Sequence, residues 1–313
     1  MMTLKTRRDF PLLVAHPGVR LALWLFLAAS SVATAAPLPK IYLASFGSDA
    51  NDGSRGSPKR NFQNAHDALP AGGEIVVLDT AGYGLLSITK DVTVTCPPGV
   101  TGLISANGNA AGAIIIDAPS AVVSLRGLTI ENLGNAARGI GVVTVGTLTV
   151  SDCVIQGFGF FGIDFSPGSN AKLIVTRCTI RNAAATAALS IQPTGGTTRA
   201  FIHGCHLESS PSGLLLSGAG ARCTARDTVA ADCNFGFDAE GGALLTLQRC
   251  TAVRNGTGVY STGSGSLVRV DACMVAGTGN FNLRQLNGGA IQSRVNNSLL
   301  DAASSAFGTY NAQ

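Results

Sequence analysis

The phrase LTVSDCVIQG at residues 148–157 decides the fold, because close variants of it recur along the chain. They read LIVTRCTIRN at 173–182, LLTLQRCTAVRN at 244–255 and VRVDACMVAG at 268–277. The equivalent positions, 25, 25, 27, 23, 22, 23 and 25 residues apart, are Leu128, Cys153, Cys178, Cys205, Thr228, Cys250, Cys273 and Ser298. Self-similarity at such a period indicates a stack of like units, each buried by its neighbours.

Each unit reads as short strands joined by bends. In LIVTRCTIRN, apolar residues alternate with polar ones, and the alternation slips by one residue at Arg177, which predicts a bend there. A second short run follows in each unit and opens with a small residue: Gly139, Gly162, Ala188, Gly213, Gly236 and Gly258. No unit has the apolar spacing of a helix. The sequence therefore predicts an all-β fold, a right-handed parallel β-helix whose coils pair about 4.8 Å apart.

These units resemble the repeats of the pectin-lyase-like superfamily. YLASFGSDANDGS at 42–54 and FQNAHDALPAGGEIVVLDTAGYG at 62–84 are similar to the opening of its secreted bacterial members, and the resemblance covers about residues 41 to 310. It implies the fold but not one activity, because the superfamily includes lyases, hydrolases, epimerases and adhesins. The Asn-Thr-Asp and Asp-Asp pair of polygalacturonases, the calcium aspartates of pectate lyases and the Asp-Pro-His-Asp of alginate epimerases are absent from the sequence.

Composition suits a long buried interior. Hydrophobic residues make up 46% of the 313 residues and charged residues only 13%, which excludes a disordered chain. Four basic residues and one acidic residue lie in the first 36, so the remainder holds 18 basic and 17 acidic residues. We therefore expect no basic face and no binding of nucleic acid.

Residues 1–36 are expected to be a cleaved signal peptide. A basic segment precedes the apolar run LALWLFLAA at 21–29, and small residues follow at 33–35. This pattern favours the general secretory route to the periplasm or the extracellular space. TRRDF at 6–10 also resembles the twin-arginine export motif, so that route stays open. The apolar run is too short to span a bilayer, and no later run does so.

Residues 37–73 are expected to close the N-terminal end of the stack. A first strand at 41–45 precedes a polar turn region, in which Asp49, Asn51 and Asp52 fit Asx turns better than a calcium loop. A helix over 61–69 is predicted from one apolar face, formed by Phe62, Ala65, His66 and Leu69. Such a helix would cap open strand edges. Residues 74–313 then form the coils of the β-helix.

The eight cysteines would usually predict disulfides in an exported chain. However, five of them occupy the repeating position, and Cys223 aligns with the inward residues Leu148 and Leu173. Side chains in parallel register point the same way, which disfavours disulfides between coils, and the lack of a CxxC pair disfavours a metal site. We expect buried free thiols at these positions. Cys96 and Cys233 lie off the repeat and stay open.

Outward residues of the second strand in each unit are the candidates for a functional site. Asp238 and Glu240 lie about 6 to 7 Å apart on one strand, with Tyr260 one coil further along and Arg284 two. Paired carboxylates can hydrolyse a glycosidic bond, and a Tyr or Arg base can serve a lyase. An ordinary solvated strand face explains the same residues. The candidate binding residues on this face are Asp164, Ser166, Gln192 and Thr262.

The sequence thus favours an exported protein whose long surface binds a polysaccharide or another envelope component. One alternative is a divergent polysaccharide lyase or glycoside hydrolase that acts on acidic polysaccharide. A second is an adhesin-like structural protein that assembles into a homo-oligomer through its C-terminal edge. No cofactor is expected, except calcium if the protein is a lyase. On the first strand, Arg181 and Glu208 are expected to form a surface ion pair, with His206 beside them.

Overall fold

The computed structural model describes residues 39–108, 111–300, 302, 304–305 and 308–309. The expected signal peptide at 1–36 lies outside these residues. Across the part that is described, no helix is both long enough and apolar enough to cross a membrane.

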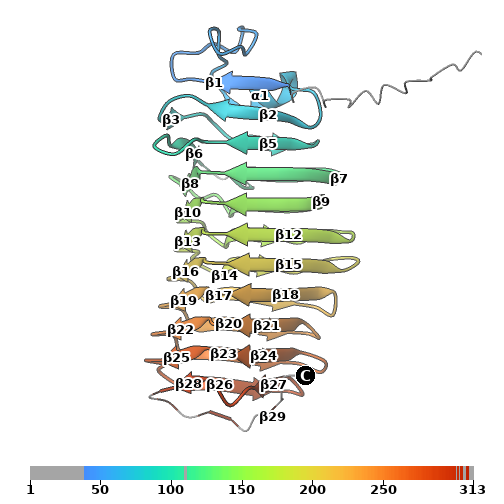
Figure 1. Ribbon diagram of the computed structural model, residues 1–313, viewed down its shortest axis with the longest axis vertical. Helices are drawn as coiled ribbons and strands as arrows, with labels where there is room; N and C mark the ends of the chain where they lie inside the picture. The colour runs from blue at the N-terminus through green and yellow to red at the C-terminus, as the bar shows by residue number, and fades with distance from the viewer. Residues whose placement is uncertain (1–38, 109–110, 301, 303, 306–307, 310–313) are drawn as a thin grey trace, which may run out of the picture. The chain divides into compact units, whose positions relative to one another are not determined.

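The described chain is a stack of coils, and each regular coil contributes one strand to each of three parallel sheets (Figure 1). Sheets 1 and 3 are joined by two long strands into one 19-stranded sheet, and sheet 2 is a separate sheet of ten strands. The sheets are numbered in the order in which a coil passes through them. Sheet 1 contains β1 (Lys40–Leu43), β2 (Gly73–Val77), β5 (Val92–Thr95), β12 (Ala171–Thr176), β15 (Thr198–His203), β18 (Ala221–Arg226), β21 (Leu244–Gln248), β24 (Leu267–Asp271), β27 (Ala290–Ser293) and β29 (Gly308–Thr309).

Sheet 2 is formed by short strands after the first bend. Its members are β3 (Ala81–Gly82), β6 (Gly102–Ala106), β8 (Leu128–Asn132), β10 (Val154–Gln156), β13 (Thr179–Arg181), β16 (His206–Glu208), β19 (Val229–Ala231), β22 (Thr251–Val253), β25 (Met274–Ala276) and β28 (Ser298–Leu299).

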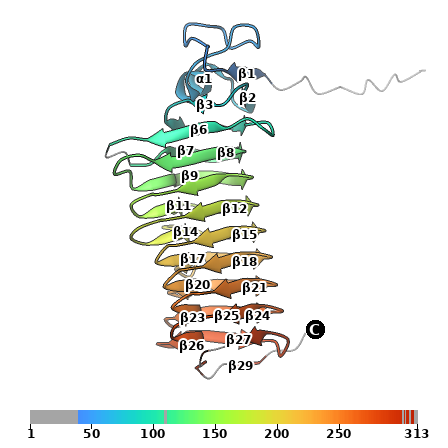
Figure 2. The same ribbon diagram turned by 90° about the vertical axis from the view of Figure 1, so that its left-hand side faces the viewer.

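Sheet 3 completes the coil, and in Figure 2 its strands lie beside those of sheet 1. It contains β4 (Leu86–Ile88), β11 (Phe161–Phe165), β14 (Ala187–Ile191), β17 (Ser212–Ser217), β20 (Phe235–Glu240), β23 (Thr257–Thr262) and β26 (Phe281–Leu286). Two longer strands, β7 (Ile114–Arg126) and β9 (Arg138–Ser151), run through both sheet 3 and sheet 1. The structure confirms the predicted parallel β-helix.

The interior is a set of vertical rows of apolar side chains. Leu148, Leu173, Ala200, Cys223 and Leu245 are in register on successive strands of sheet 1, and all are buried. The residues between them face outward, which produces the alternating burial of β12. The predicted stacking of residues some two dozen apart is therefore correct.

The bend between sheets 1 and 2 is made by single residues with positive φ. Asp152, Arg177, Asp227, Arg249 and Ala272 have φ between 49° and 55°. Each such residue turns the chain, so the cysteine or threonine that follows points inward again. The slip in alternation at Arg177 is this bend, as the sequence predicts.

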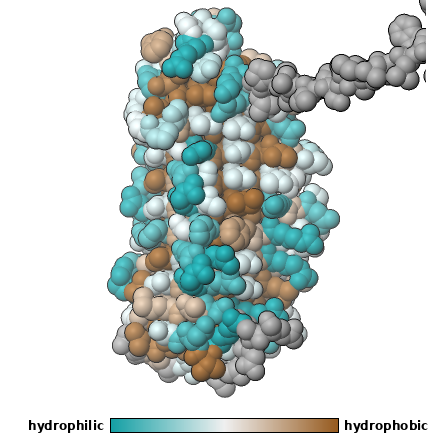
Figure 3. Space-filling model, viewed as in Figure 1, coloured by the Kyte–Doolittle hydropathy of each residue, from teal (hydrophilic) through white to brown (hydrophobic). Residues whose placement is uncertain are grey.

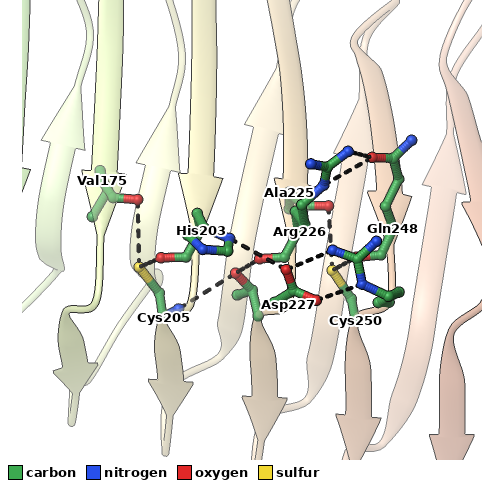
Figure 4. Close-up of polar contacts among 10 residues, drawn as sticks. Val175, His203, Cys205, Ala225, Arg226, Asp227, Gln248 and Cys250 are labelled. Atoms are coloured by element: carbon green, nitrogen blue, oxygen red, sulfur yellow. Dashed lines mark hydrogen bonds and ion pairs between the residues drawn. The ribbon is translucent and has the colours of Figure 1, made fainter.

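The thiols that follow this bend are buried. The side chain of Cys205 donates to the carbonyl oxygens of His203 at 3.4 Å and Val175 at 3.6 Å (Figure 4). All eight cysteines, including Cys96 and Cys233, are buried and free. Burial raises the pKa of the Cys96 and Cys233 thiols to about 11. The expectation of buried thiols at the repeating position is confirmed.

Small residues occupy the second position of the strands in sheet 3 because neighbouring coils leave no room for a side chain. A Cβ atom on Gly236 would lie 2.6 Å from the carbonyl oxygen of Gly258, and one on Gly213 would lie 2.6 Å from that of Gly236. At Gly162 it would lie 2.2 Å from the Cγ2 atom of Ile180. These contacts explain the small residue that recurs in the sequence.

The N-terminal helix α1 (Phe62–Ala68) confirms the predicted cap. It contacts β1, β2 and β4, and Phe62 packs edge-on against Tyr83 at 5.6 Å. His66 on the apolar face of this helix is 1% exposed. Before the helix, the Asp52 carboxylate accepts from the Ser54 amide at 2.9 Å, which is the expected Asx turn.

Charged residues at the bend form ladders along the stack. The Asp227 carboxylate accepts two hydrogen bonds from Arg249 at 2.8 Å. His203 Nδ1 lies 3.4 Å from the same carboxylate (Figure 4). The predicted Arg181–Glu208 pair is wrong. The two residues are in register, but Arg181 donates to the Gln156 side chain at 2.9 Å instead.

Candidate functional site

The candidate site lies on the outward face of sheet 3. One row runs straight along the stack, one residue per coil, through Asp164, Ser190, Leu215, Asp238, Tyr260 and Arg284. The structure therefore brings Asp238, Tyr260 and Arg284 together in the predicted order. Glu240 is two residues beyond Asp238 on β20, in register with Thr262 on β23.

Three aromatic side chains and one arginine form what we call the platform. The Phe235 and Tyr260 rings stack with centroids 4.8 Å apart and an interplanar angle of 26°. The Arg284 guanidinium lies 6.0 Å from the Tyr260 centroid and 5.0 Å from that of Phe281. The four side chains are half-buried. A surface of this kind can stack on a flat apolar ligand face and donate hydrogen bonds beside it.

Sequence reasoning missed Phe235 and Phe281. Each aromatic residue is the first residue of its strand in sheet 3 and directly precedes a pair of buried residues. In β20 that pair is Gly236 and Phe237, both buried, so simple alternation places Phe235 on the wrong side. The recurring small residue was the signal that could have identified this irregularity.

Asp238 is buried although its position faces outward. It is only 3% exposed, whereas the sequence predicted a solvated strand face. Leu215 on the preceding coil and Tyr260 on the next are its in-register neighbours. One carboxylate oxygen lies 3.4 Å from the Ser212 hydroxyl, and the other has no hydrogen-bond partner among the described residues. Burial and the nearby Glu240 charge raise the pKa of Asp238 to about 8.

A hollow of about 410 Å³ lies three coils away on the same face. Arg138 Nε donates to the Asp164 carboxylate at 2.5 Å, and the Ser166 hydroxyl donates to the other oxygen of that carboxylate. Gly141 is in register with Asp164 and has no side chain to fill the space. Two of the predicted binding residues thus line one hollow, and Arg138 is a partner that sequence reasoning missed.

The other two predicted binding residues lie apart from this hollow. Gln192 directly follows β14, and its backbone amide donates to the Phe165 carbonyl. Thr262 ends β23 beside Glu240, and its hydroxyl accepts from Asn287 at 3.4 Å. Within the described ranges, no group of three or more His, Cys, Asp or Glu side chains is placed to hold a metal ion.

Comparisons with known proteins agree with the β-helix architecture. A family model described as a right handed beta helix region matches residues 111–275. The solved structure of pectate lyase Pel9A is similar, with a TM-score of 0.65 at 14% identity over 89% of this chain and 80% of that one. A rhamnogalacturonan lyase has a TM-score of 0.55 at 11% identity, over 86% and 84%. No curated protein sequence matches. At these identities the structural likeness shows the fold alone.

Proposed function

Because the chain belongs to the right-handed β-helix family, we propose that it is an exported protein that binds a polysaccharide along the outward face of sheet 3. The fold is related to that of polysaccharide lyases. Export rests on the N-terminal sequence pattern, with the general secretory route favoured. The activity of a relative does not transfer with its fold, so the proposal depends on the side chains of this face.

The accessibility of the platform, compared with that of Asp238, carries the proposal. Phe235, Tyr260, Phe281 and Arg284 are half-buried, whereas Asp238 is 3% exposed. A general acid or base must come within hydrogen-bond reach of the substrate atom that it serves. Asp238 lacks that access, while the rings beside it are only half-buried and offer apolar surface to a sugar.

The hollow at Asp164 extends the same face. Asp164 and Asp238 occupy one in-register row and are three coils apart, about 14 Å at the spacing of neighbouring strands. A polysaccharide that lies along the stack can therefore reach both the platform and the hollow. Arg138 and Ser166 would supply hydrogen bonds at one end, and Arg284 at the other.

A lyase or hydrolase is the second candidate, and one observation favours it. With a pKa of about 8, Asp238 holds its proton at neutral pH, as a general acid requires. This reading needs Leu215 or Tyr260 to move so that a glycosidic oxygen can approach the carboxyl group. Formation of new chain ends from a polysaccharide would establish it.

Affinity electrophoresis against polygalacturonate, rhamnogalacturonan and a neutral galactan tests the proposal. The double variant Tyr260→Ala/Arg284→Ala should weaken binding to the retained polymer about tenfold, a loss of about 1.4 kcal/mol. Phe46→Ala is the control, since Phe46 is 74% exposed at the N-terminal turn. Equal binding by wild type and double variant would exclude this face. Release of unsaturated or reducing chain ends from the polymer would show that the protein is an enzyme and does not only bind.

A further inference from the structure

Three cations form a row on sheet 1, on a different face from the platform. Lys172, Arg199 and Arg222 are in register at the second position of β12, β15 and β18, and all three are exposed. Neighbours in the row are about 4.8 Å apart along the stack. Figure 3 shows this face, with hydrophilic side chains gathered along the right-hand edge, where these strands begin. We call these three residues the cationic row.

The cationic row has no counter-charge in the part of the chain that the structure describes. No ion pair or hydrogen bond involves the charged groups of Lys172, Arg199 or Arg222. At the bends, by contrast, Arg177, Arg249 and Arg254 each pair with an aspartate. Like charges directly opposite one another on neighbouring strands are destabilising. A bound anion would remove that repulsion.

Two shallow hollows accompany the row and meet at Arg199. One, of about 330 Å³, is lined by Gly146, Asn170, Ala171, Lys172, Thr197 and Arg199. The other, of about 300 Å³, extends from Arg199 past Arg222 and Thr224 to Arg269 on β24. The hollows therefore form a path across successive coils. Threonine and asparagine side chains along it supply hydrogen-bonding groups between the cations.

We propose that the cationic row is a binding site for a linear acidic polysaccharide that lies along the stack. A ligand whose anionic groups repeat along a chain matches cations that repeat once per coil, and its hydroxyl groups match Asn170, Thr197 and Thr224. Phe201, two residues beyond Arg199 on β15, is 37% exposed and offers a ring beside the path. This site is separate from the platform and does not depend on it.

Nucleic acid fits the same observations less well. Tight binding to a phosphate backbone uses many cationic contacts, whereas this row has three, with Arg269 at the end of the path. After residue 36 the chain is close to neutral, with 18 basic and 17 acidic residues. The sequence predicted no basic face because the three cations are widely separated in the chain. The coils bring them together.

The test compares two triple variants that remove the same charge. The row variant is Lys172→Gln/Arg199→Gln/Arg222→Gln, and the corner variant is Arg177→Gln/Arg249→Gln/Arg254→Gln. Both are made in the Tyr260→Ala/Arg284→Ala background, so that the platform does not contribute. Binding to polygalacturonate, dextran sulfate, neutral dextran and a single-stranded DNA oligonucleotide is measured over a range of salt concentrations.

We expect the row variant to lose at least tenfold in affinity for polygalacturonate or dextran sulfate. The slope of log affinity against log salt concentration should become shallower by about two to three, because each lost contact releases about one counterion fewer. The corner variant should bind like its parent. Whether polygalacturonate or dextran sulfate binds more tightly shows whether the row prefers carboxylate or sulfate groups. Equal losses in both variants, no loss in the row variant, or tighter binding to DNA than to either acidic polymer would overturn the proposal.

Discussion

Replacing Asp238 with asparagine should change how stability depends on pH. The folded protein holds the Asp238 proton up to about pH 8, while the unfolded chain releases it near pH 4. Below pH 4 both states are protonated, so burial of the carboxyl group carries no penalty from ionisation. As the pH rises from 4 to 8, the unfolded state is increasingly favoured because it alone loses the proton.

The expected size follows from these two pKa values. Each pH unit in this range lowers the free energy of unfolding of the wild type by up to about 1.4 kcal/mol, about 6 kcal/mol in all. Asparagine has nearly the same shape and does not titrate. Asp238→Asn should therefore match the wild type near pH 4 and become more stable than it by several kcal/mol near pH 8.

Thermal unfolding followed by circular dichroism from pH 4 to pH 8 measures this difference. Asp232→Asn is the control, because its bond to Arg254 lowers the pKa of Asp232. An aspartate of that kind stabilises the protein above its unfolded pKa and loses this contribution as the pH falls. The control should therefore never gain stability at high pH. If the difference in melting temperature between wild type and Asp238→Asn stays constant from pH 4 to pH 8, the burial argument is refuted.

Three further predictions concern the stack itself. Gly236→Ala should destabilise the protein by more than about 1 kcal/mol, since the new Cβ would lie 2.6 Å from a carbonyl oxygen, whereas Gly56→Ala, with open space around it, should change the melting temperature little. Asn255→Ala should lower the free energy of unfolding by about 1 to 3 kcal/mol in denaturant titrations. The substitution leaves the buried Cys233 amide and Ala230 carbonyl without the hydrogen bonds that the Asn255 side chain makes. The thiols should not react with Ellman's reagent until the protein unfolds, because they are buried; rapid reaction of the native protein would contradict their placement.

The fold could be predicted because its signal repeats. The bend at Arg177, the inward cysteines and the order of Asp238, Tyr260 and Arg284 all follow from a period of about two dozen residues and one alternation. Register turns that period into vertical contacts. Positions along the rows could therefore be assigned without coordinates.

The environment of the site could not be predicted in the same way. Whether Asp238 is solvated depends on the side chains of neighbouring coils, where Leu215 and Tyr260 hold the in-register positions, and on how each side chain leans. Arg181 likewise has Gln156 and Glu208 on neighbouring coils, and it donates to Gln156. Alternation cannot predict which of the two is the partner. Pattern assigns a residue to a face of the strand, but burial and pairing depend on side-chain geometry.

The most direct test is a crystal structure of the protein with an oligosaccharide of the polymer that it retains most strongly. We predict intact sugar units stacked over Phe235 and Tyr260, with Arg284 donating to them. Sugar bound only elsewhere, or a cleaved product beside an uncovered Asp238, would contradict binding without catalysis on sheet 3.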